Sequence, residues 1–404
     1  MSVSNLLTRR NRQWASVFVA VVAVAVVALA VGNGSRATAS RSGATATSAV
    51  GQLGSGRGGY PRVIRLAHSG SADGALIASV TTTGGVEAIF RSTNDGVSFS
   101  RVGSIAEPAG QRGQCCGSLY ELPRRIGTMP AGTLLFAASY GAQTPPMSIR
   151  LFASTDRGST WHAVSTVVKA PAGAPPTEGV WEPEMLVDPA GELVVYFSDQ
   201  TQPGHSQALM ERTSASGRTW SRSQPVVELA APSAEPGMAV VNPLPDGTLF
   251  MTYELCTPVY GCIAAYRTSR DGVHWGNPAS PGTPIIATNG DWFKNTPNTT
   301  VIKDGKPGGE ILLVGHYYYN SDHQPAAGNG DTLLVNRDGG AGPWKAMHAP
   351  IAVPVVAKCA NYSSSLLATH HSTEVLEIAQ VETSPIFGCA ARYATEQLPA
   401  WAQP

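Results

Sequence analysis

Short apolar segments separated by turn residues are the main pattern along this chain. A proline followed by a glycine, and then a run of apolar residues, recurs at three places: "MPAGTLLFAASY" from 129, "DPAGELVVYFSD" from 188 and "PLPDGTLFMTYE" from 243. Each segment predicts a tight turn that leads into a β-strand. Helical periodicity is almost absent, so the pattern predicts an all-β protein.

A second signature follows each of these strands, and an earlier copy precedes them. The copies are "STNDGVSF" at 92–99, "STDRGSTW" at 154–161, "TSASGRTW" at 213–220 and "TSRDGVHW" at 268–275, with a weak fifth copy at 336–344. In such a turn, a Ser or Thr and an Asp bond backbone amides, the Gly permits a positive φ, and the aromatic residue packs between sheets. We expect a structural role for this signature.

The acid of this signature is not constant along the chain. Asp156 fits the expected position best, Asp95 and Asp271 are displaced by one place, and Ala215 replaces the acid. The glycines at 96, 158, 217 and 272 are 62, 59 and 55 residues apart. A period of about 60 residues fits a four-stranded antiparallel blade, and the remaining length gives about six blades. We therefore predict a six-bladed β-propeller; a β-sandwich would not explain the period.

The N-terminus carries the features of a targeting segment. Three arginines, at positions 9, 10 and 12, precede an apolar run at 15–31, and "ATA" at 37–39 is a candidate cleavage site. We interpret 1–39 as a signal peptide or an uncleaved N-terminal anchor, which in both cases exports the rest of the chain. Residues 40–58 are mostly Ser, Gly, Ala and Thr and predict a flexible linker. The propeller is then expected at 59–404, in a secreted or membrane-anchored protein.

Composition narrows the partners and the compartment. The 28 basic and 28 acidic residues balance, and only 14% of residues are charged, which argues against nucleic acid or an anionic membrane surface as the main partner. Six cysteines in an exported chain suggest disulfides. Cys256 and Cys262 are the easiest pair to close, Cys359 with Cys389 is plausible, and the state of adjacent Cys115 and Cys116 is left open. Zinc is disfavoured, because no paired CxxC or clustered His accompanies them.

The recurring signature resembles the Asp boxes (BNR repeats) of sialidase-like β-propellers. Longer stretches, among them "YPRVIRL" at 60–66, "CCGSLYELP" at 115–123, "VWEPEMLVDPAGELVVYFSDQ" at 180–200 and "CANYSSSLL" at 359–367, resemble the exo-α-1,5-arabinanases of glycoside hydrolase family 93. The similarity runs over most of 59–395. It implies a sialidase-like six-bladed propeller and a retaining mechanism. It also implies release of short arabino-oligosaccharides from the ends of α-1,5-linked arabinan.

The resemblance also implies three catalytic residues. Glu182, which begins the "EP" stretch, is similar to the general acid/base, and Glu254, which ends the "TYE" strand, is similar to the nucleophile. Tyr362 in "NYSSSLL" is similar to the tyrosine that contacts the nucleophile. The resemblance implies that both glutamates belong to the pair, and the opposite division of roles between them is left open.

Chemistry gives independent support for such a pair. Retaining hydrolysis needs two carboxyl groups about 5 Å apart, one protonated and one ionised. A hydrogen bond from Tyr362 would favour ionised Glu254, and burial beside Trp181 would favour protonated Glu182. Glu184 is interpreted as a bystander, and Glu235 in "AEPGM" is a competing candidate. Each glutamate could instead be an ordinary surface carboxylate, which the adjacent apolar strands disfavour.

Further candidates could bind substrate. They are Arg62, whose alternative role is a surface ion pair, Trp181, Asp199 in "SDQ", Trp292 as an aromatic platform, and Tyr317 in "GHYYYN", for which strand packing is the favoured alternative. The histidines at 316 and 323 lack companion ligands, and His274 belongs to a signature turn. No step of the mechanism calls for a cofactor or a metal, and a structural calcium is left open.

Two other functions remain open on the sequence. A sialidase would hold a carboxylate with three arginines, for which Arg62, Arg267 or Arg270, and Arg337 are the candidates, beside Glu254 and Tyr362. A non-catalytic glycan-binding propeller would fit if Glu182 and Glu254 were remote. The expected partner is in each case a saccharide, and a monomer is expected. The sequence does not distinguish L- from D-arabinan or fix the product length.

Overall fold

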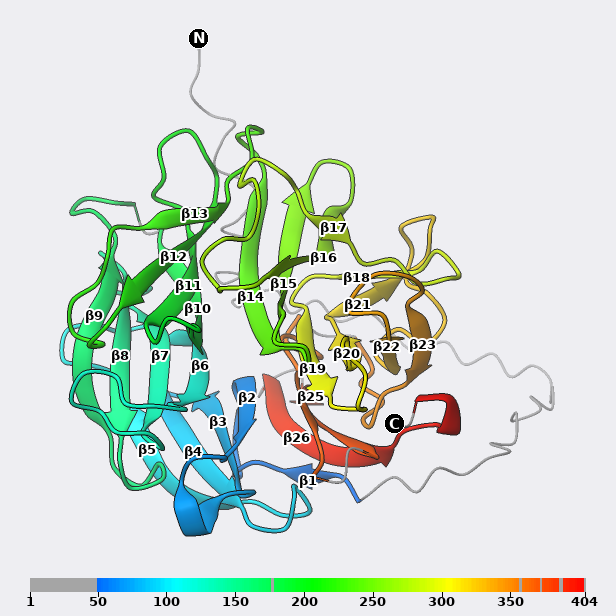
Figure 1. Cartoon of the computed structure of the whole chain (residues 1–404), viewed down its shortest axis with the longest axis horizontal. Helices are drawn as coiled ribbons and strands as arrows, with labels where there is room; N and C mark the ends of the chain where they lie inside the picture. The colour runs from blue at the N-terminus through cyan, green and yellow to red at the C-terminus, as the bar shows by residue number, and fades with distance from the viewer. Residues whose placement is uncertain (1–48, 176–177, 356–357, 371–372, 385–387, 403–404) are drawn as a thin grey trace, which may run out of the picture. The chain divides into compact units, whose positions relative to one another are not determined.

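The turn-punctuated apolar segments form antiparallel sheets in the computed structural model, which describes residues 49–175, 178–355, 358–370, 373–384 and 388–402. Two short 3-10 helices, Gly70–Ala72 and Ala400–Ala402, are the helical elements in these ranges. The strands form six sheets, which we number as blades in chain order (Figure 1). The predicted all-β, six-bladed propeller is confirmed.

Blades 1 to 3 each consist of four strands that are consecutive in the chain. Blade 1 contains β2 (Gly59–Arg65), β3 (Leu76–Thr82), β4 (Val86–Ser92) and β5 (Ser100–Ala106); blade 2 contains β6 (Cys115–Glu121), β7 (Leu134–Tyr140), β8 (Ser148–Ser154) and β9 (His162–Lys169); blade 3 contains β10 (Val180–Val187), β11 (Leu193–Asp199), β12 (Ala208–Ser214) and β13 (Gln224–Val227).

Blades 4 to 6 depart from this simple order. Blade 4 contains β14 (Glu235–Pro243), β15 (Leu249–Thr257), β16 (Gly261–Ser269) and β17 (Thr283–Pro284), with β18 (Trp292–Lys294) and β21 (Tyr317–Tyr319) added; blade 5 contains β19 (Asn298–Ile302), β20 (Glu310–Val314), β22 (Thr332–Asn336) and β23 (Lys345–His348); blade 6 contains β24 (Ser365–Ala368), β25 (Glu374–Ser384), β26 (Gly388–Gln397) and β1 (Gly51–Gln52).

The first strand of each blade lies on the inside of the ring. β2, β6, β10, β14, β19 and β24 each contact the next in this order, and β24 contacts β2. Between neighbouring blades lie apolar clusters that draw buried side chains from both, such as Leu135 with Val195 between blades 2 and 3, and Phe250 with Ile311 between blades 4 and 5. Burial of these facing surfaces is what holds the blades together.

The ring is closed by a strand from the N-terminal side. β1 pairs antiparallel with β26, with Gly51 opposite Tyr393, and Leu53 is buried in the cluster between blades 6 and 1. The predicted flexible linker at 40–58 is therefore wrong at its C-terminal end. The Gly- and Ser-rich composition gave no sign of this strand. Two paired residues and buried Leu53 are enough to hold it in place, because the strand adds to the edge of an existing sheet.

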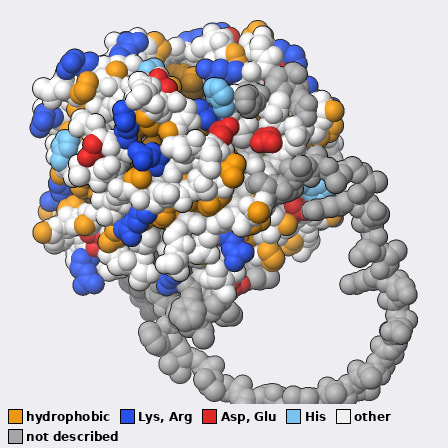
Figure 2. All heavy atoms as spheres, turned by 90° about the horizontal axis from the view of Figure 1, so that it is seen from below, with side chains coloured by type: hydrophobic (Ala, Val, Ile, Leu, Met, Phe, Trp, Pro, Cys, Tyr) orange, Lys and Arg blue, Asp and Glu red, His pale blue; other side chains and the backbone are white. Residues whose placement is uncertain are grey.

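The predicted signal peptide or anchor at 1–39, with its apolar run at 15–31, lies outside the described residues. Among the residues that the structure describes, none belongs to a helix long and apolar enough to cross a membrane. On the face in Figure 2, basic and acidic side chains of the described residues are interspersed, as the balanced composition would suggest.

In the four main signature turns, the serine hydroxyl accepts a hydrogen bond from the amide of the turn glycine. In the second copy, Ser154 Oγ accepts a hydrogen bond from the Gly158 amide at 2.9 Å and donates one to Asp156 at 2.7 Å, and Asp156 accepts the Thr160 amide at 2.9 Å. The indole N–H of Trp161 donates to the Gly158 carbonyl at 3.0 Å, and this bond links the turn to the packed indole side chain.

The acid position of these turns is counted from the serine. Asp271 stands two residues after Ser269, as Asp156 does after Ser154, and accepts the amides of Val273 and His274. Its apparent displacement reflects a turn that reaches its glycine one residue sooner. Asn94 fills the same position in the first copy, so that Asp95 is released to pair with Arg65 of blade 1 at 2.6 Å.

The six cysteines form three disulfides. Cys256–Cys262 and Cys359–Cys389 pair as predicted, and the question left open for the adjacent pair is answered by a Cys115–Cys116 bond. Cys256 and Cys262 stand directly opposite each other on β15 and β16, so the hairpin register brings them together.

Candidate active site

A repeated backbone irregularity marks the inner strands. In blades 1 to 4 the pairing register shifts on the inner strand, at a residue with positive φ: Tyr60 (50°), Cys116 (65°), Glu182 (57°) and Met238 (56°). In blades 5 and 6 the residues just before the inner strands, Thr296 (49°) and Ser363 (55°), do the same. Positive φ is unfavourable for residues with a side chain, and such strain gathers at functional sites. Each blade thus has at least one residue with positive φ at or just before its inner strand.

Glu182 occupies this bulge in blade 3. Its Oε2 accepts a hydrogen bond from Ser198 Oγ of β11 at 2.7 Å. Ser198 is fully buried and its Oγ accepts the Met238 amide of blade 4 at 3.2 Å. The carboxylate is therefore oriented by two blades. The sequence interpretation missed Ser198, although it lies next to Asp199 in the "SDQ" motif.

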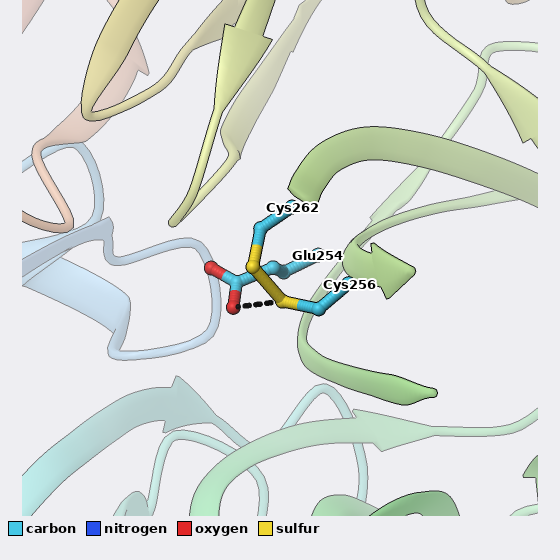
Figure 3. Close-up of side chains that lie close together, drawn as sticks. All are labelled: Glu254, Cys256 and Cys262. Atoms are coloured by element: carbon cyan, nitrogen blue, oxygen red, sulfur yellow. Dashed lines mark hydrogen bonds between the residues drawn. A yellow bond between two sulfur atoms is a disulfide. The ribbon is translucent and has the colours of Figure 1, made fainter. Parts of the chain in front are cut away.

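Glu254 lies on β15, opposite Gly237 of β14. Its Oε2 accepts the Thr296 amide at 2.9 Å, and its Oε1 lies 3.0 Å from Cys256 Sγ. Because Cys256 is bonded to Cys262, its sulfur has no hydrogen to donate, and the contact is between a carboxylate oxygen and a disulfide. Figure 3 shows the carboxylate beside this disulfide. These three residues have their donor atoms close together. The disulfide removes the thiolates that a metal would need.

The strand β14 connects the two glutamates. Gly237 pairs with Glu254, and the next residue, Met238, bonds the serine that holds Glu182. A Cβ on Gly237 would lie 2.4 Å from Ser198 Oγ and 2.3 Å from Gln207 Nε2. A side chain at position 237 would therefore displace the Ser198 hydroxyl and the Gln207 amide, and glycine lets blades 3 and 4 approach closely without that displacement. Gln207 itself donates to the Pro236 carbonyl at 2.8 Å and fixes this stretch of β14.

Glu184 belongs to the contacts between inner strands. It accepts hydrogen bonds from Ser118 Oγ of blade 2 at 2.8 Å and from the Val241 amide of blade 4 at 3.3 Å. Burial raises its pKa to about 7, and the positive charge of Arg62 acts in the opposite direction. The interpretation of Glu184 as a bystander missed this link between three blades.

Arg62 lies among these charges. Its guanidinium stacks over the Tyr60 ring at 4.1 Å and donates to Ser363 Oγ at 3.1 Å. Burial raises the pKa of Tyr60 well above its usual range; the charge of Arg62 lowers it and that of Glu182 raises it further. Arg62 thus lies beside Tyr60 and Glu184 rather than in a surface ion pair, and Tyr60 is an electrostatic neighbour of Glu182.

Tyr362 packs where blades 5 and 6 meet the inner ring. It lies against an apolar cluster of Tyr60, Cys116 and Met238, and its ring meets that of His316 edge-on, with 5.3 Å between centroids. The ring of Tyr317 stacks on the His316 ring, with 3.8 Å between the two centroids. Burial lowers the pKa of His316 to about 4, so it is neutral at pH 7. The predicted contact between Tyr362 and Glu254 stays a prediction.

Two of the predicted substrate-binding residues have structural roles instead. Trp292 is 3% exposed and packs edge-on against Tyr260 and Tyr319, so it cannot serve as a sugar platform. Asp199 is buried and accepts the Thr201 amide at 2.8 Å, which caps the turn after β11. Both motifs stand beside loops, but their side chains turn into the blades. Trp181 is partly buried and donates to Gln200 Oε1 at 2.8 Å.

The arginines named for a sialidase do not converge. Arg267 is 6% exposed and donates to the backbone carbonyls of Trp275 and Asn277. Arg270 is largely exposed beside Asp246, and Arg337 pairs with Glu310 at 3.1 Å. Each therefore has a local structural partner away from the inner strands, and Arg62 remains the member of that set on an inner strand.

Solved structures share this architecture. An α-L-arabinanase of Penicillium chrysogenum complexed with arabinobiose matches with a TM-score of 0.69 and 22% identity, covering 84% of this chain and 93% of that one. A GH93 α-L-arabinofuranosidase of Fusarium graminearum with arabinobiose matches with a TM-score of 0.67, 22% identity and coverage of 84% and 93%. The fold is that of the family 93 propellers.

More distant propellers mark the wider group. The NanB sialidase of Streptococcus pneumoniae matches with a TM-score of 0.56 and 12% identity, covering 87% of this chain and 70% of that one. Neither a protein-family model nor a curated protein matches the sequence. The likeness is thus in the sialidase-like fold, and the chemistry has to be argued from the side chains on the inner strands.

Proposed function

We propose that this propeller is a secreted retaining glycoside hydrolase that acts on α-1,5-linked arabinan from chain ends and releases short arabino-oligosaccharides. The observation that carries the proposal is the shared anchoring of Glu182 and Glu254 on β14. One is held through Ser198 and Met238, and the other stands opposite Gly237. Neighbours of the same fold are complexed with arabinobiose, which supports this substrate class.

The hydrogen bonds favour a division of labour. The Thr296 amide donates to Glu254, and a backbone donor stabilises the ionised carboxylate that a nucleophile needs. Ser198 donates to one oxygen of Glu182. In the proposed mechanism the other oxygen carries the proton of the general acid. We therefore assign Glu254 as nucleophile and Glu182 as acid/base.

The reaction then takes two balanced steps. Glu182 gives its proton to the glycosidic oxygen while Glu254 attacks the anomeric carbon, which breaks the glycosidic bond and forms a glycosyl ester. Glu182, now ionised, takes a proton from water. That water attacks the same carbon, releases Glu254 and restores both carboxyl groups. Two inversions leave the configuration of the product unchanged.

The disulfides and the N-terminal sequence support the proposal that the protein is exported. Three disulfides are typical of an oxidising compartment, and the basic and apolar N-terminal pattern is that of a targeting segment. A polymeric substrate outside the cell would meet the enzyme there. The proposed partner is an arabinan chain, and the enzyme is proposed to act as a monomer.

Hydrolysis of debranched α-1,5-L-arabinan, compared with its D-arabinan counterpart and sialyllactose, tests the proposal. We expect short arabino-oligosaccharides from one arabinan and no release of sialic acid. Glu182→Gln and Glu254→Gln should each lower kcat by at least about hundredfold. Glu235→Gln, at the start of β14, is the matched carboxylate change and should stay active. Product configuration is read by NMR in the first minutes.

Other outcomes favour the alternatives. Loss of activity in Glu235→Gln with an active Glu182→Gln would contradict the assigned pair. Hydrolysis of sialyllactose would favour the sialidase. Binding of arabinan by calorimetry without hydrolysis would favour a glycan-binding propeller.

A further inference from the structure

The proposed mechanism makes no use of the disulfide between the adjacent residues Cys115 and Cys116. It sits at the inner-strand bulge of blade 2, where Cys116 has a φ of 65°, the position that Glu182 holds in blade 3. A disulfide stabilises a fold mainly by closing a loop of the unfolded chain, and the gain shrinks with the loop. A disulfide between adjacent residues closes almost no loop. Global stability is therefore a weak reason for this bond.

The surroundings of the disulfide are apolar and come from several blades. Cys116 is buried against Tyr60 of blade 1 and Met238 of blade 4, with the partly buried Cys115 and Tyr362 packed on them. We call these five residues the axial cluster. Among the clusters of the described residues it is the one that joins side chains from the bulge positions of the inner strands.

The axial cluster adjoins the proposed catalytic pair. The amide of Met238 bonds the serine that orients Glu182, and the charge of Glu182 acts on Tyr60. Two residues beyond Cys116, Ser118 donates to Glu184 on the strand of Glu182. The partly exposed residues of the cluster, Cys115 and Tyr362, therefore pack on residues that neighbour the proposed catalytic pair.

We propose that the Cys115–Cys116 disulfide is a sugar-binding platform that contacts the C–H face of an arabinofuranose unit beside the bond to be cleaved. This inference rests on the proposed function. The bond closes a small rigid ring with polarisable sulfurs and no hydrogen-bond donor. Such a surface suits the apolar face of a sugar, while the flanking carboxylates and Arg62 suit its hydroxyls. It replaces the aromatic platform expected from Trp292, which is buried.

A kinetic comparison tests the platform. In the double variant Cys115→Ala and Cys116→Ala, KM for arabino-oligosaccharides should rise about tenfold with kcat within about twofold, because a contact made equally in ground and transition states affects binding alone. Trp275→Phe is the matched control. It loses the indole bond to the Gly272 carbonyl in a signature turn, so it should lower Tm and leave KM unchanged.

A second measurement keeps the test independent of folding of the variant. Wild-type protein is reduced with a phosphine, alkylated and mapped by mass spectrometry, with and without arabinobiose. The sugar should slow reduction of Cys115–Cys116 at least about threefold relative to Cys359–Cys389, because a bound ring shields the sulfurs.

The outcomes separate the platform from the proposed function. An unchanged KM, a parallel fall of kcat and Tm, or reduction unaffected by arabinobiose would overturn the platform while the wild-type enzyme still cleaves arabinan. Wild-type protein that fails to cleave arabinan contradicts the proposed function instead. Protection by arabinobiose in that case would leave a sugar-binding platform in a non-catalytic propeller.

Discussion

Single residues with unusual backbone angles build the candidate site. Glu182 points where it does because its φ of 57° sits within a register shift between Trp181 and Glu184. A regular strand would alternate its side chains and place Glu182 and Glu184 on one face. The bulge separates their partners: Glu182 bonds Ser198 of its own blade, whereas Glu184 bonds Ser118 of blade 2.

The different partners of the two catalytic candidates predict different rescue behaviour. On a 4-nitrophenyl arabinobioside, whose leaving group needs no protonation, Glu182→Gln should still form the glycosyl-enzyme, and azide should speed its turnover. Glu254→Gln should remain inactive, because no small anion restores the attached nucleophile in a retaining pathway. Nitrophenolate release with a stopped-flow burst measures both. Rescue of Glu254→Gln with retention of configuration would reverse the roles.

At the scale of elements, the signature turns are fasteners between strands. Ser154 ends β8, and its hydroxyl serves both the Gly158 amide and Asp156. The same arrangement recurs with Ser269 and Gly272 in blade 4. These turns lie at the ends of third strands, away from the inner strands, so their chemistry supports the fold and leaves the site untouched.

Ser154→Ala should therefore destabilise the protein without altering the active site. The change leaves the buried Gly158 amide without its acceptor, which costs about 1–2 kcal/mol. Thr155→Ala, at the exposed neighbouring position, is the control and should be nearly neutral. Chemical denaturation measures the free energy of unfolding, and kcat/KM per folded molecule should be equal in the three proteins. A neutral Ser154→Ala would show that the turn is held by other bonds.

For the whole molecule, the propeller buries several carboxyl groups between and within blades. Burial raises the pKa of each from an ordinary value of 4.5: to about 7 for Glu87, Glu184 and Glu310, and to about 8 for Glu211 and Glu377. Each therefore binds its proton more tightly in the folded chain than in the unfolded chain. Between about pH 4.5 and 8 the folded state holds more protons, so stability falls as pH rises.

We accordingly expect the Tm to be a few degrees higher at pH 5.5 than at pH 8.5. His316 has the opposite effect on stability. Burial lowers its pKa to about 4, so the unfolded chain binds the proton more tightly, and the stabilising effect of the neutral histidine grows as pH rises to 6.5. The effect of this one histidine on the free energy of unfolding offsets only part of the combined effect of the five carboxyl groups. Calorimetry across this range measures the slope, and Glu377→Gln should flatten it because the amide does not titrate. A Tm that rises steadily from pH 5.5 to 8.5 would contradict the prediction.

The repeat, and the blades that it implies, can be read from the amino-acid sequence alone. Turn-then-strand segments and signature glycines about 60 residues apart predicted the blades, because the hydrogen bonds of a tight turn are local and a strand's apolar face is visible in its own residues. The facing of Cys256 and Cys262 across a short turn was likewise predictable. The resemblance in "WEP" and "TYE" supplied the glutamate pair, and local context identified neither Ser198 nor Thr296 as its partners.

Which side chains meet on the inner strands depends on how the blades pack in three dimensions. Trp292 looked like a platform beside a loop, yet it is packed into blade 4, and Glu184 looked idle, yet it bonds residues of blades 2 and 4. The closing strand β1 was hidden in a Gly- and Ser-rich stretch because its strength comes from β26, more than 300 residues away. Contacts between blades form only when the ring closes, and closure joins segments that are far apart in the sequence. No single segment of the sequence therefore predicts these contacts.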